Sequence, residues 1–243
     1  MKYDVVVIGS GPGGYVAAIR CAQLGMKTAM IEKYASIGGT CLNVGCIPSK
    51  ALLDSTEHYH KAKHQFKEHG INVGELKVDF KKMVARKQSV VDQTVGGVEY
   101  LMKKNKIDVY HGVGSFVTKN KIAVTKSDGK KEELEAKNVI IATGSKPASL
   151  DFINIDKKRI ITSTEALELK EIPKSMAVIG GGIIGVELGS VYARLGTKVT
   201  IIEYMDSLIP TMDVDLGKEM KKVMSGLDCD VLLKHKVNFV DTK

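Results

Sequence analysis

The feature that most constrains the fold is a pattern that occurs twice with the same internal spacing. Short apolar segments at residues 4–8 and 176–179 each run into a glycine-rich loop, an apolar helix pattern and a second apolar segment ending on a glutamate. The two copies are offset by 171 residues throughout. The matching positions are Gly9, Gly11, Gly14, Gly25 and Glu32, and then Gly180, Gly182, Gly185, Gly196 and Glu203. Two copies in one register predict two strand–turn–helix–strand units.

The spacing in each copy is typical of a dinucleotide-binding loop. The first glycine permits a tight turn, the second lets a pyrophosphate approach the backbone, and the third lets helix and strand pack closely. The helix N-terminus favours an anion, and an acid about 20 residues further on can accept hydrogen bonds from a ribose. We therefore predict two dinucleotide sites. The alternative, that Glu32 and Glu203 are strand-end acids facing water, fits their matched positions less well.

A second motif follows the first copy, in which Cys41 and Cys46 are separated by four residues. Five positions correspond to about 500° of helix at 3.6 residues per turn, so the two side chains cannot share one helix face. A disulfide between them requires a distorted turn, which Gly45 permits. A dithiol beside a redox-cofactor site indicates an electron relay. The alternatives are two buried thiols or a zinc site, for which no further ligand pair has suitable spacing.

Composition narrows the class of protein. The chain has 243 residues, enough for two domains, and no apolar run approaches the roughly 20 residues that span a bilayer. We expect a soluble protein without a secretion signal. The net charge is +8, but only four of the basic residues are arginines, so a solvated surface is favoured over nucleic-acid binding. Cys21 and Cys229 are expected to be packing residues.

The remaining pattern predicts the other elements. A helix is expected from residue 48 or 49 to about 68, and an amphipathic stretch over 79–104, softened near Gly96-Gly97. An antiparallel meander is expected over 109–117, 121–126 and 131–135, with a buried strand at 138–142. The second copy is followed by one helix pattern at 214–227 and one strand at 231–233, about half of a doubly wound sheet. His60 and His64 are spaced i, i+4 and could share a metal, although a polar helix face is favoured.

The predicted fold class is α/β. It comprises two Rossmann-like dinucleotide-binding domains, in three layers with parallel sheets and one small antiparallel meander. The predicted domains are 1–146 and 147–243, with a linker at Lys146-Pro147 and the second domain incomplete.

Three segments resemble one family over essentially the whole chain. These segments are Gly39–Lys50, Ala142–Ser145 and Gly180–Glu187. They are similar to the pyridine nucleotide–disulfide oxidoreductases, and most similar to members that oxidise protein-bound dihydrolipoamide and reduce NAD⁺. The resemblance implies FAD at the first glycine loop and NAD at the second. No metal site is expected, because no further ligand pair has suitable spacing near the cysteines.

The resemblance also implies site residues. The FAD site would comprise Gly9, Gly11, Gly14, Glu32, Lys33, Gly39, Thr40, Cys41, Lys50, Gly114, Thr143, Gly144 and Ser145. The NAD side would comprise Gly180, Gly182, Gly185, Glu187, Glu203 and Val237. The catalytic set would be Cys41, Cys46, Lys50 and Glu187. In these roles Cys46 lies against the flavin and Cys41 forms the mixed disulfide with substrate, while Lys50 pairs with Glu187 and ties the two domains together. The alternative for Lys50 is a surface lysine at a helix start.

Partners and alternatives follow from the same resemblance. Glu203 is followed by Tyr204-Met205-Asp206 without a basic residue, which favours NAD over NADP. The partners implied are a lipoyl domain of a 2-oxoacid dehydrogenase complex or of the glycine cleavage system, and a second copy of the full-length protein in a homodimer. The implied location is the cytoplasm or, if the protein is eukaryotic and processed, the mitochondrial matrix. The alternatives are an NADPH-dependent reductase of glutathione, trypanothione or mercuric ion, and a catalytically silent FAD-binding fragment. The family's catalytic histidine lies in a C-terminal dimerisation domain without counterpart here, so we expect the isolated chain to be inactive.

Overall fold

The computed structural model describes residues 1–148 and 150–241, which fall into two compact units. The first unit comprises Met1–Ile47 and Ser89–Lys146, and the second comprises Pro48–Gln88 and Pro147–Lys243. The segment Pro48–Gln88, which lies within the predicted first domain, therefore belongs to the same unit as the second glycine loop.

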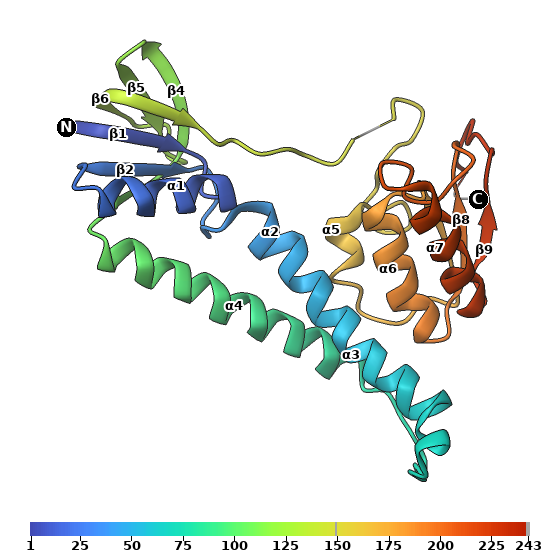
Figure 1. The fold of residues 1–243 in the computed structure, drawn as a ribbon. Coiled ribbons are helices and arrows are strands. Elements are labelled where there is room, and N and C mark those ends of the chain that lie inside the picture. Colours follow the sequence, from blue (N-terminus) through green and yellow to red (C-terminus); the bar gives the residue numbers. More distant parts are fainter. Residues whose placement is uncertain (149, 242–243) are drawn as a thin grey trace. The chain divides into compact units, whose positions relative to one another are not determined.

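The first unit contains one six-stranded sheet (Figure 1) in the order β3-β2-β1-β6-β5-β4. The strands are β1 (Lys2–Ile8), β2 (Thr28–Glu32), β3 (Asp108–His111), β4 (Val113–Thr118), β5 (Lys121–Thr125) and β6 (Lys131–Ile141). Strands β3, β2, β1 and β6 pair in parallel, whereas β6, β5 and β4 form an antiparallel meander. The sheet is therefore a parallel core with an antiparallel extension.

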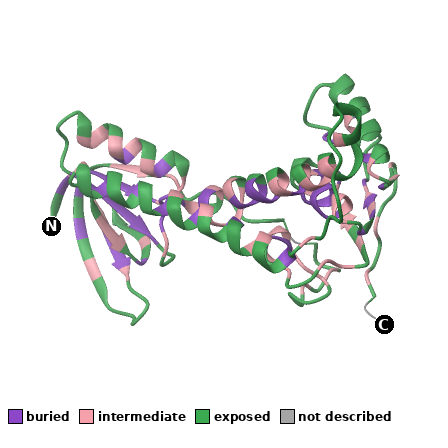
Figure 2. Ribbon diagram, turned by 90° about the horizontal axis from the view of Figure 1, so that it is seen from below, coloured by how far each residue is buried: buried purple, intermediate pink, exposed green. Residues whose placement is uncertain are grey.

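Apolar layers cover both faces of this sheet. On one face, Val5, Val7 and Met30 pack with helices α1 (Pro12–Gln23), α2 (Gly39–Val44) and the later part of α4 (Phe80–Lys104). On the other face, Val6 and Ile31 pack against residues of the meander, including Val124. In Figure 2, buried residues run along the inner strands of this sheet. The alternating faces of β1 thus produce the predicted three layers, because successive strand residues point to opposite sides.

Several predicted elements differ from the observed ones. The stretch 109–117 is two strands, because the chain turns at Gly112, where φ is +156° and a Cβ would lie 2.6 Å from the Thr125 carbonyl oxygen. The predicted strands 131–135 and 138–142 are one continuous strand, β6, which pairs with both β5 and β1. Helix α4 passes through Gly96-Gly97 without a break, because its buried stripe of valines continues on both sides.

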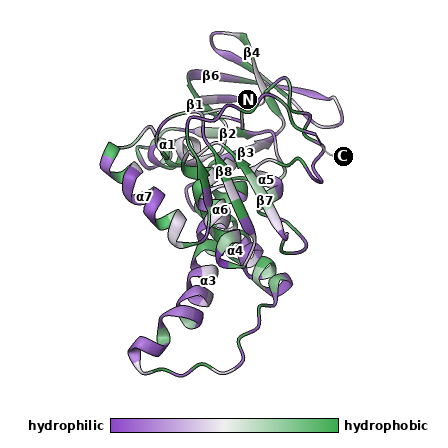
Figure 3. Ribbon diagram, turned by 90° about the vertical axis from the view of Figure 1, so that its right-hand side faces the viewer, coloured by the Kyte–Doolittle hydropathy of each residue, from purple (hydrophilic) through white to green (hydrophobic). Residues whose placement is uncertain are grey.

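The second unit contains a three-stranded parallel sheet of order β7-β8-β9. Its elements are β7 (Ser175–Ile179), β8 (Lys198–Ile202), β9 (Asp230–Leu232), η1 (Phe66–His69), α5 (Ser163–Ala166), α6 (Ile183–Arg194) and α7 (Val214–Gly226), together with α3 (Cys46–His64) from Pro48 onward. Leu52 of α3, Val191 of α6 and Ile201 of β8 belong to one apolar core. Hydrophilic and hydrophobic residues alternate along α7 (Figure 3), and Met224 is its fully buried contact with this core.

The two units repeat one another in detail. Val5 pairs with Thr28 in the first sheet and Met176 with Val199 in the second, again at an offset of 171. The copies differ beside the first strand, since β1 pairs with β2 and β6, whereas β7 pairs only with β8 among the described residues. A Cβ on Gly9 would therefore lie 2.1 Å from the Ala142 carbonyl oxygen, while one on Gly180 would meet nothing within 4 Å.

Candidate functional site

The two glycine loops have nearly the same backbone. Gly9 and Gly180 have φ of +104° and +102°, a region that favours glycine. A Cβ on Gly14 would lie 1.9 Å from the Gly9 carbonyl oxygen, and one on Gly185 would lie 2.3 Å from that of Gly180. The positive φ thus disfavours a side chain at the first glycine of each loop, and the lack of space excludes one at the third, so that each helix packs directly on the preceding strand.

Helices α1 and α6 begin immediately after these loops. Their N-cap residues are Gly11 and Gly182, and no side chain caps either helix within the described part of the chain. The first N–H groups of each helix thus lack a side-chain acceptor, and the helix dipole adds positive potential at the same place. This arrangement fits a pyrophosphate at both loops.

Each fingerprint acid is buried and held by its own glycine loop. Glu32 is 4% exposed and accepts hydrogen bonds from the backbone N–H of Ser10 at 3.0 Å and of Tyr34 at 2.9 Å. Glu203 is 8% exposed and accepts from the N–H of Gly181 at 2.6 Å and of Met205 at 2.7 Å. The donors are equivalent in the two copies, so these acids do not simply face water. A carboxylate has about four acceptor positions, which leaves capacity for a ribose hydroxyl.

The cysteine segment is anchored on the first glycine loop. Gly38 and Gly39 have φ of +100° and +62°, and a Cβ on Gly39 would lie 2.5 Å from the Cα of Gly11. The Gly38 N–H also donates to the Ser10 carbonyl oxygen at 3.1 Å. Helix α2, which carries Thr40 and Cys41, therefore begins directly against the predicted pyrophosphate loop.

The two cysteines lie on different helices. Cys41 is half-buried in α2, and Cys46 is the exposed first residue of α3. Gly45 separates the helices with φ of −140° and ψ of −117°, and a Cβ there would lie 2.8 Å from the Thr40 carbonyl oxygen and 3.3 Å from the Cα of Cys41. The chain thus folds back on Cys41 just before Cys46, which is the distorted turn predicted from their spacing.

Lys50 and Glu187 form an ion pair that joins α3 to α6 within the second unit. The Lys50 side chain is 60% exposed and that of Glu187 is 26% exposed. The structure therefore brings together the lysine and glutamate that the resemblance pairs, although they are 137 positions apart. Both belong to one packing unit, so the pair is an internal contact of that unit.

The remaining predicted site residues occupy loops and strand ends. Gly114 lies over the sheet, where a Cβ would be 3.2 Å from Ile8 and 3.3 Å from Ile31. Thr143, Gly144 and Ser145 are exposed just beyond the end of β6. Lys33 follows Glu32, and its ammonium lies 4.7 Å from the centre of the Tyr34 ring. Val237 is half-buried in the tail after β9.

Two residues missed by the sequence analysis support this site. Asn43 donates from its side-chain amide to the carbonyl oxygens of Ile37 and Gly39, both at 2.9 Å. Ser10 donates from its hydroxyl to Glu32 at 2.5 Å. A polar residue between the two cysteines was a visible signal for Asn43. The contact of Ser10 depends on the tertiary fold and had no signal in the sequence.

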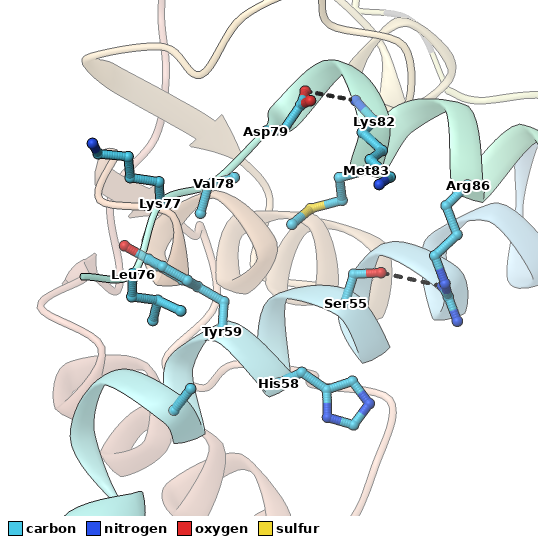
Figure 4. A pocket seen from close by; sticks show the side chains of 11 residues that line it. Ser55, His58, Tyr59, Leu76, Lys77, Val78, Asp79, Lys82, Met83 and Arg86 are labelled. Carbon is cyan, nitrogen blue, oxygen red and sulfur yellow. Dashed lines mark hydrogen bonds between the residues drawn. The ribbon is translucent and has the colours of Figure 1, made fainter. Parts of the chain in front are cut away.

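An open pocket of about 550 Å³ lies elsewhere in the second unit, between α3 and the segment leading into α4 (Figure 4). Its lining includes Tyr59, Val78 and Met83. Two of its cations are paired, since Arg86 donates to Asp54 and Lys77 pairs with Glu75. The pocket contains none of the predicted site residues.

The histidine pair on α3 is placed as its spacing predicts. The rings of His60 and His64 have centroids 4.7 Å apart. Burial, His64 and Arg194 lower the pKa of His60. Across residues 1–148 and 150–241, no three acidic, histidine or cysteine side chains are grouped to hold a metal ion. Nor is any described helix long and apolar enough to cross a membrane.

Comparisons with known proteins agree with this geometry. Residues 3–243 match the family model described as pyridine nucleotide-disulphide oxidoreductase. The chain is 50% identical over 239 residues to leghemoglobin reductase of Vigna unguiculata, covering 98% of this chain and 46% of that protein. It is 55% identical over 215 residues to dihydrolipoyl dehydrogenase of Trypanosoma brucei brucei, covering 88% of this chain and 45% of that protein.

A solved structure has the same fold. The Cu(II) complex of the HOCl-induced flavoprotein disulfide reductase RclA from Escherichia coli superimposes with a TM-score of 0.84 at 29% identity, covering 99% of this chain and 51% of that one. The chain thus spans about half the length of the relatives it matches. With its two glycine loops, each holding its own acid, and its cysteine segment docked on the first, the chain belongs to the pyridine nucleotide–disulfide oxidoreductase family, whose members use FAD and NAD(H).

Proposed function

We propose that this chain supplies the disulfide and the two nucleotide sites of an enzyme that oxidises a dihydrolipoyl group and reduces NAD⁺. Relatives named dihydrolipoyl dehydrogenase, at 48–55% identity, support this substrate. The observation that carries the proposal is the contact of Gly39 with Gly11, which sets the cysteine helix on the predicted pyrophosphate loop. A dithiol and a redox cofactor can exchange electrons only when they are adjacent.

The chemistry of the cysteines is thiol–disulfide exchange. Starting from the Cys41–Cys46 disulfide, one thiolate of the substrate attacks the sulfur of Cys41, and Cys46 leaves as a thiolate. The second thiolate of the substrate then attacks the substrate sulfur of this mixed disulfide and displaces Cys41. The substrate leaves as a cyclic disulfide, and two electrons remain on the cysteine pair. Each exchange requires a thiolate attacker and an accessible sulfur, and two protons are released from the substrate thiols.

The other residues bind and orient. Bound FAD would accept the two electrons from the cysteine pair and pass them to NAD⁺. Gly9, Gly11 and Gly14 would hold its pyrophosphate and Glu32 its ribose, with Lys33, Thr40, Gly114 and Thr143–Ser145 along the same groove. Gly180, Gly182, Gly185, Glu203 and Val237 would hold NAD. Lys50, oriented by Glu187, would place a cation near the flavin and favour negative charge there.

The nicotinamide preference follows from Glu203. A buried carboxylate accepts a hydrogen bond from the ribose 2′-OH and repels a 2′-phosphate. Tyr204, Met205 and Asp206 provide no cation to offset that repulsion. This favours NAD over the NADPH used by reductases of glutathione or mercuric ion.

The proposed partners are a lipoyl domain of a 2-oxoacid dehydrogenase complex or of the glycine cleavage system, and a second copy of the full-length enzyme. Four of the relatives, from Arabidopsis thaliana, Pisum sativum and Schizosaccharomyces pombe, carry the word mitochondrial in their names. For a eukaryotic source we therefore propose the mitochondrial matrix, and otherwise the cytoplasm.

The proposal is tested by reconstituting the chain with FAD and reducing it stepwise with dithionite. We expect saturable binding, measured by the change in flavin fluorescence, and a long-wavelength absorbance band after two electrons, caused by the Cys46 thiolate against the ring. Cys46→Ser should abolish the band, whereas the control Cys229→Ser should retain it. Absence of FAD binding, or a band that persists in Cys46→Ser, would overturn the proposal.

A further inference from the structure

Ser10 differs from its counterpart in the second copy, Gly181, by its side chain, a Cβ that carries a hydroxyl group. Both residues donate a backbone N–H to the fingerprint acid. Both also accept, at their carbonyl oxygens, an N–H from the equivalent later residue, Gly38 at 3.1 Å and Ile209 at 2.8 Å. The backbone arrangement is therefore common to the two loops.

The hydroxyl of Ser10 makes two hydrogen bonds that have no equivalent in the second copy. It donates to the carboxylate of Glu32 at 2.5 Å and accepts from the N–H of Gly38 at 3.0 Å. Ser10 is fully buried and Glu32 is 4% exposed, so water does not compete readily for these bonds. Hydrogen bonds to a charged group are among the stronger ones in proteins.

Only the first copy has a redox segment after this point. Gly38 is the N-cap of helix α2, which carries Cys41, whereas Ile209 is followed by Pro210 and Thr211. In the second copy a Cβ at position 181 would lie 2.5 Å from a methyl group of Leu208, so a side chain there would require the buried Leu208 to move. The hydroxyl thus occurs in the copy that the cysteine segment follows in the sequence.

We infer that Ser10 is a positioning residue, whose hydroxyl couples the ribose acid Glu32 to the backbone that starts the cysteine helix. The hydrogen bonds of Ser10 are present in the chain without any cofactor. The importance of Ser10 for catalysis rests on the proposed function. The bridge holds Gly38 in place and so limits the opening of the turn ahead of Cys41. The coupling works in both directions, because a restraint on one end of the bridge is felt at the other.

The test uses amide hydrogen exchange of residues 33–46 in the chain without added FAD, and alkylation of Cys41 and Cys46 by iodoacetamide after mild reduction. Ser10→Ala keeps the Cβ and Ser10→Gly copies the second loop, and both remove the hydroxyl. We expect about tenfold faster exchange at Gly38 and faster alkylation of Cys41 in both variants, corresponding to loss of one buried, charge-assisted hydrogen bond. Thr28→Val removes a buried hydroxyl elsewhere in the same unit and should change neither.

A double-mutant cycle tests the bridge itself. Glu32→Gln should speed exchange at Gly38 in the same direction, and Ser10→Ala combined with Glu32→Gln should add little to either single change. Full additivity, or unchanged exchange and alkylation in both Ser10 variants, would overturn the inference. FAD titration of the same proteins separates the two proposals. If the unmodified chain binds no FAD, the proposed function fails, while the exchange data still decide the role of Ser10.

Discussion

Gly39 packs so closely on Gly11 that a Cβ on Gly39 would lie 2.5 Å from the Gly11 Cα. One glycine belongs to the predicted pyrophosphate loop and the other starts the cysteine helix, so this contact joins the two motifs that define the chain. Backbone lies on both sides of the contact, and neither side can yield by rotating a side chain.

Replacing Gly39 with alanine should disrupt the first unit. The residue has φ of +62°, which costs an alanine about 1 kcal/mol, and the added methyl group would displace the Gly11 backbone. We expect the free energy of unfolding to fall by about 3 kcal/mol in urea titrations, with loss of FAD binding. Gly13→Ala is the control, because an added Cβ there meets nothing within 4 Å in a helix. Equal stability of the two variants would contradict the importance of this contact.

The Lys50–Glu187 pair should matter for electrostatics more than for stability. Since the Lys50 side chain is 60% exposed, we expect Lys50→Met to lower the free energy of unfolding by less than about 1 kcal/mol. If its cation lies near the flavin as proposed, Lys50→Met should make the reduction potential of bound FAD more negative. Lys222→Met, which removes a similarly exposed pair with Glu219, should leave that potential unchanged. A shift of the same size in both variants would argue against a local role for Lys50.

The thiol of Cys229 should not react with alkylating reagents at neutral pH, and its ionisation should destabilise the folded chain at high pH. Burial, with Asp228 and Asp230, raises its pKa from 9.0 to about 11. Between these values the unfolded chain loses the thiol proton before the folded chain does, so stability should fall as pH rises from about 9 to 11. In urea titrations, the free energy of unfolding should fall less between pH 9 and 11 in Cys229→Ala than in the unmodified chain. Rapid reaction of Cys229 with iodoacetamide at pH 7 would contradict its burial.

Glu203 should determine nicotinamide choice. Glu203→Gln keeps an acceptor for the ribose but removes the charge. We therefore expect NAD⁺ to bind about tenfold more weakly, and the ratio of NADP⁺ affinity to NAD⁺ affinity to rise. Isothermal titration calorimetry measures both affinities. Glu32→Gln is the matched variant in the first copy and should weaken FAD binding while leaving NAD⁺ binding unaffected. Unchanged preference in Glu203→Gln would show that other groups select the cofactor.

The local chemistry of the sequence determined the repeated units. A tight turn needs Gly9 and Gly180, close helix packing needs Gly14 and Gly185, and these demands act over a few residues, so the spacing alone predicted both loops. The need for a distorted turn between Cys41 and Cys46 was likewise evident from helix geometry. The single strand expected over 109–117 was wrong, because Gly112 breaks it where the backbone meets Thr125, a contact made only in the assembled sheet.

Tertiary packing alone decided how these parts meet. Residues far apart in sequence come together at Lys50 and Glu187, at Gly39 and Gly11, and at the hydroxyl bridge of Ser10. No periodicity encodes such contacts, because they depend on where whole strands and helices come to rest. The continuous strand β6 shows the same limit, since its pairing with both β1 and β5 follows from strand order and not from its own residues. Local constraints therefore specify the motifs of this chain, and long-range packing specifies their arrangement.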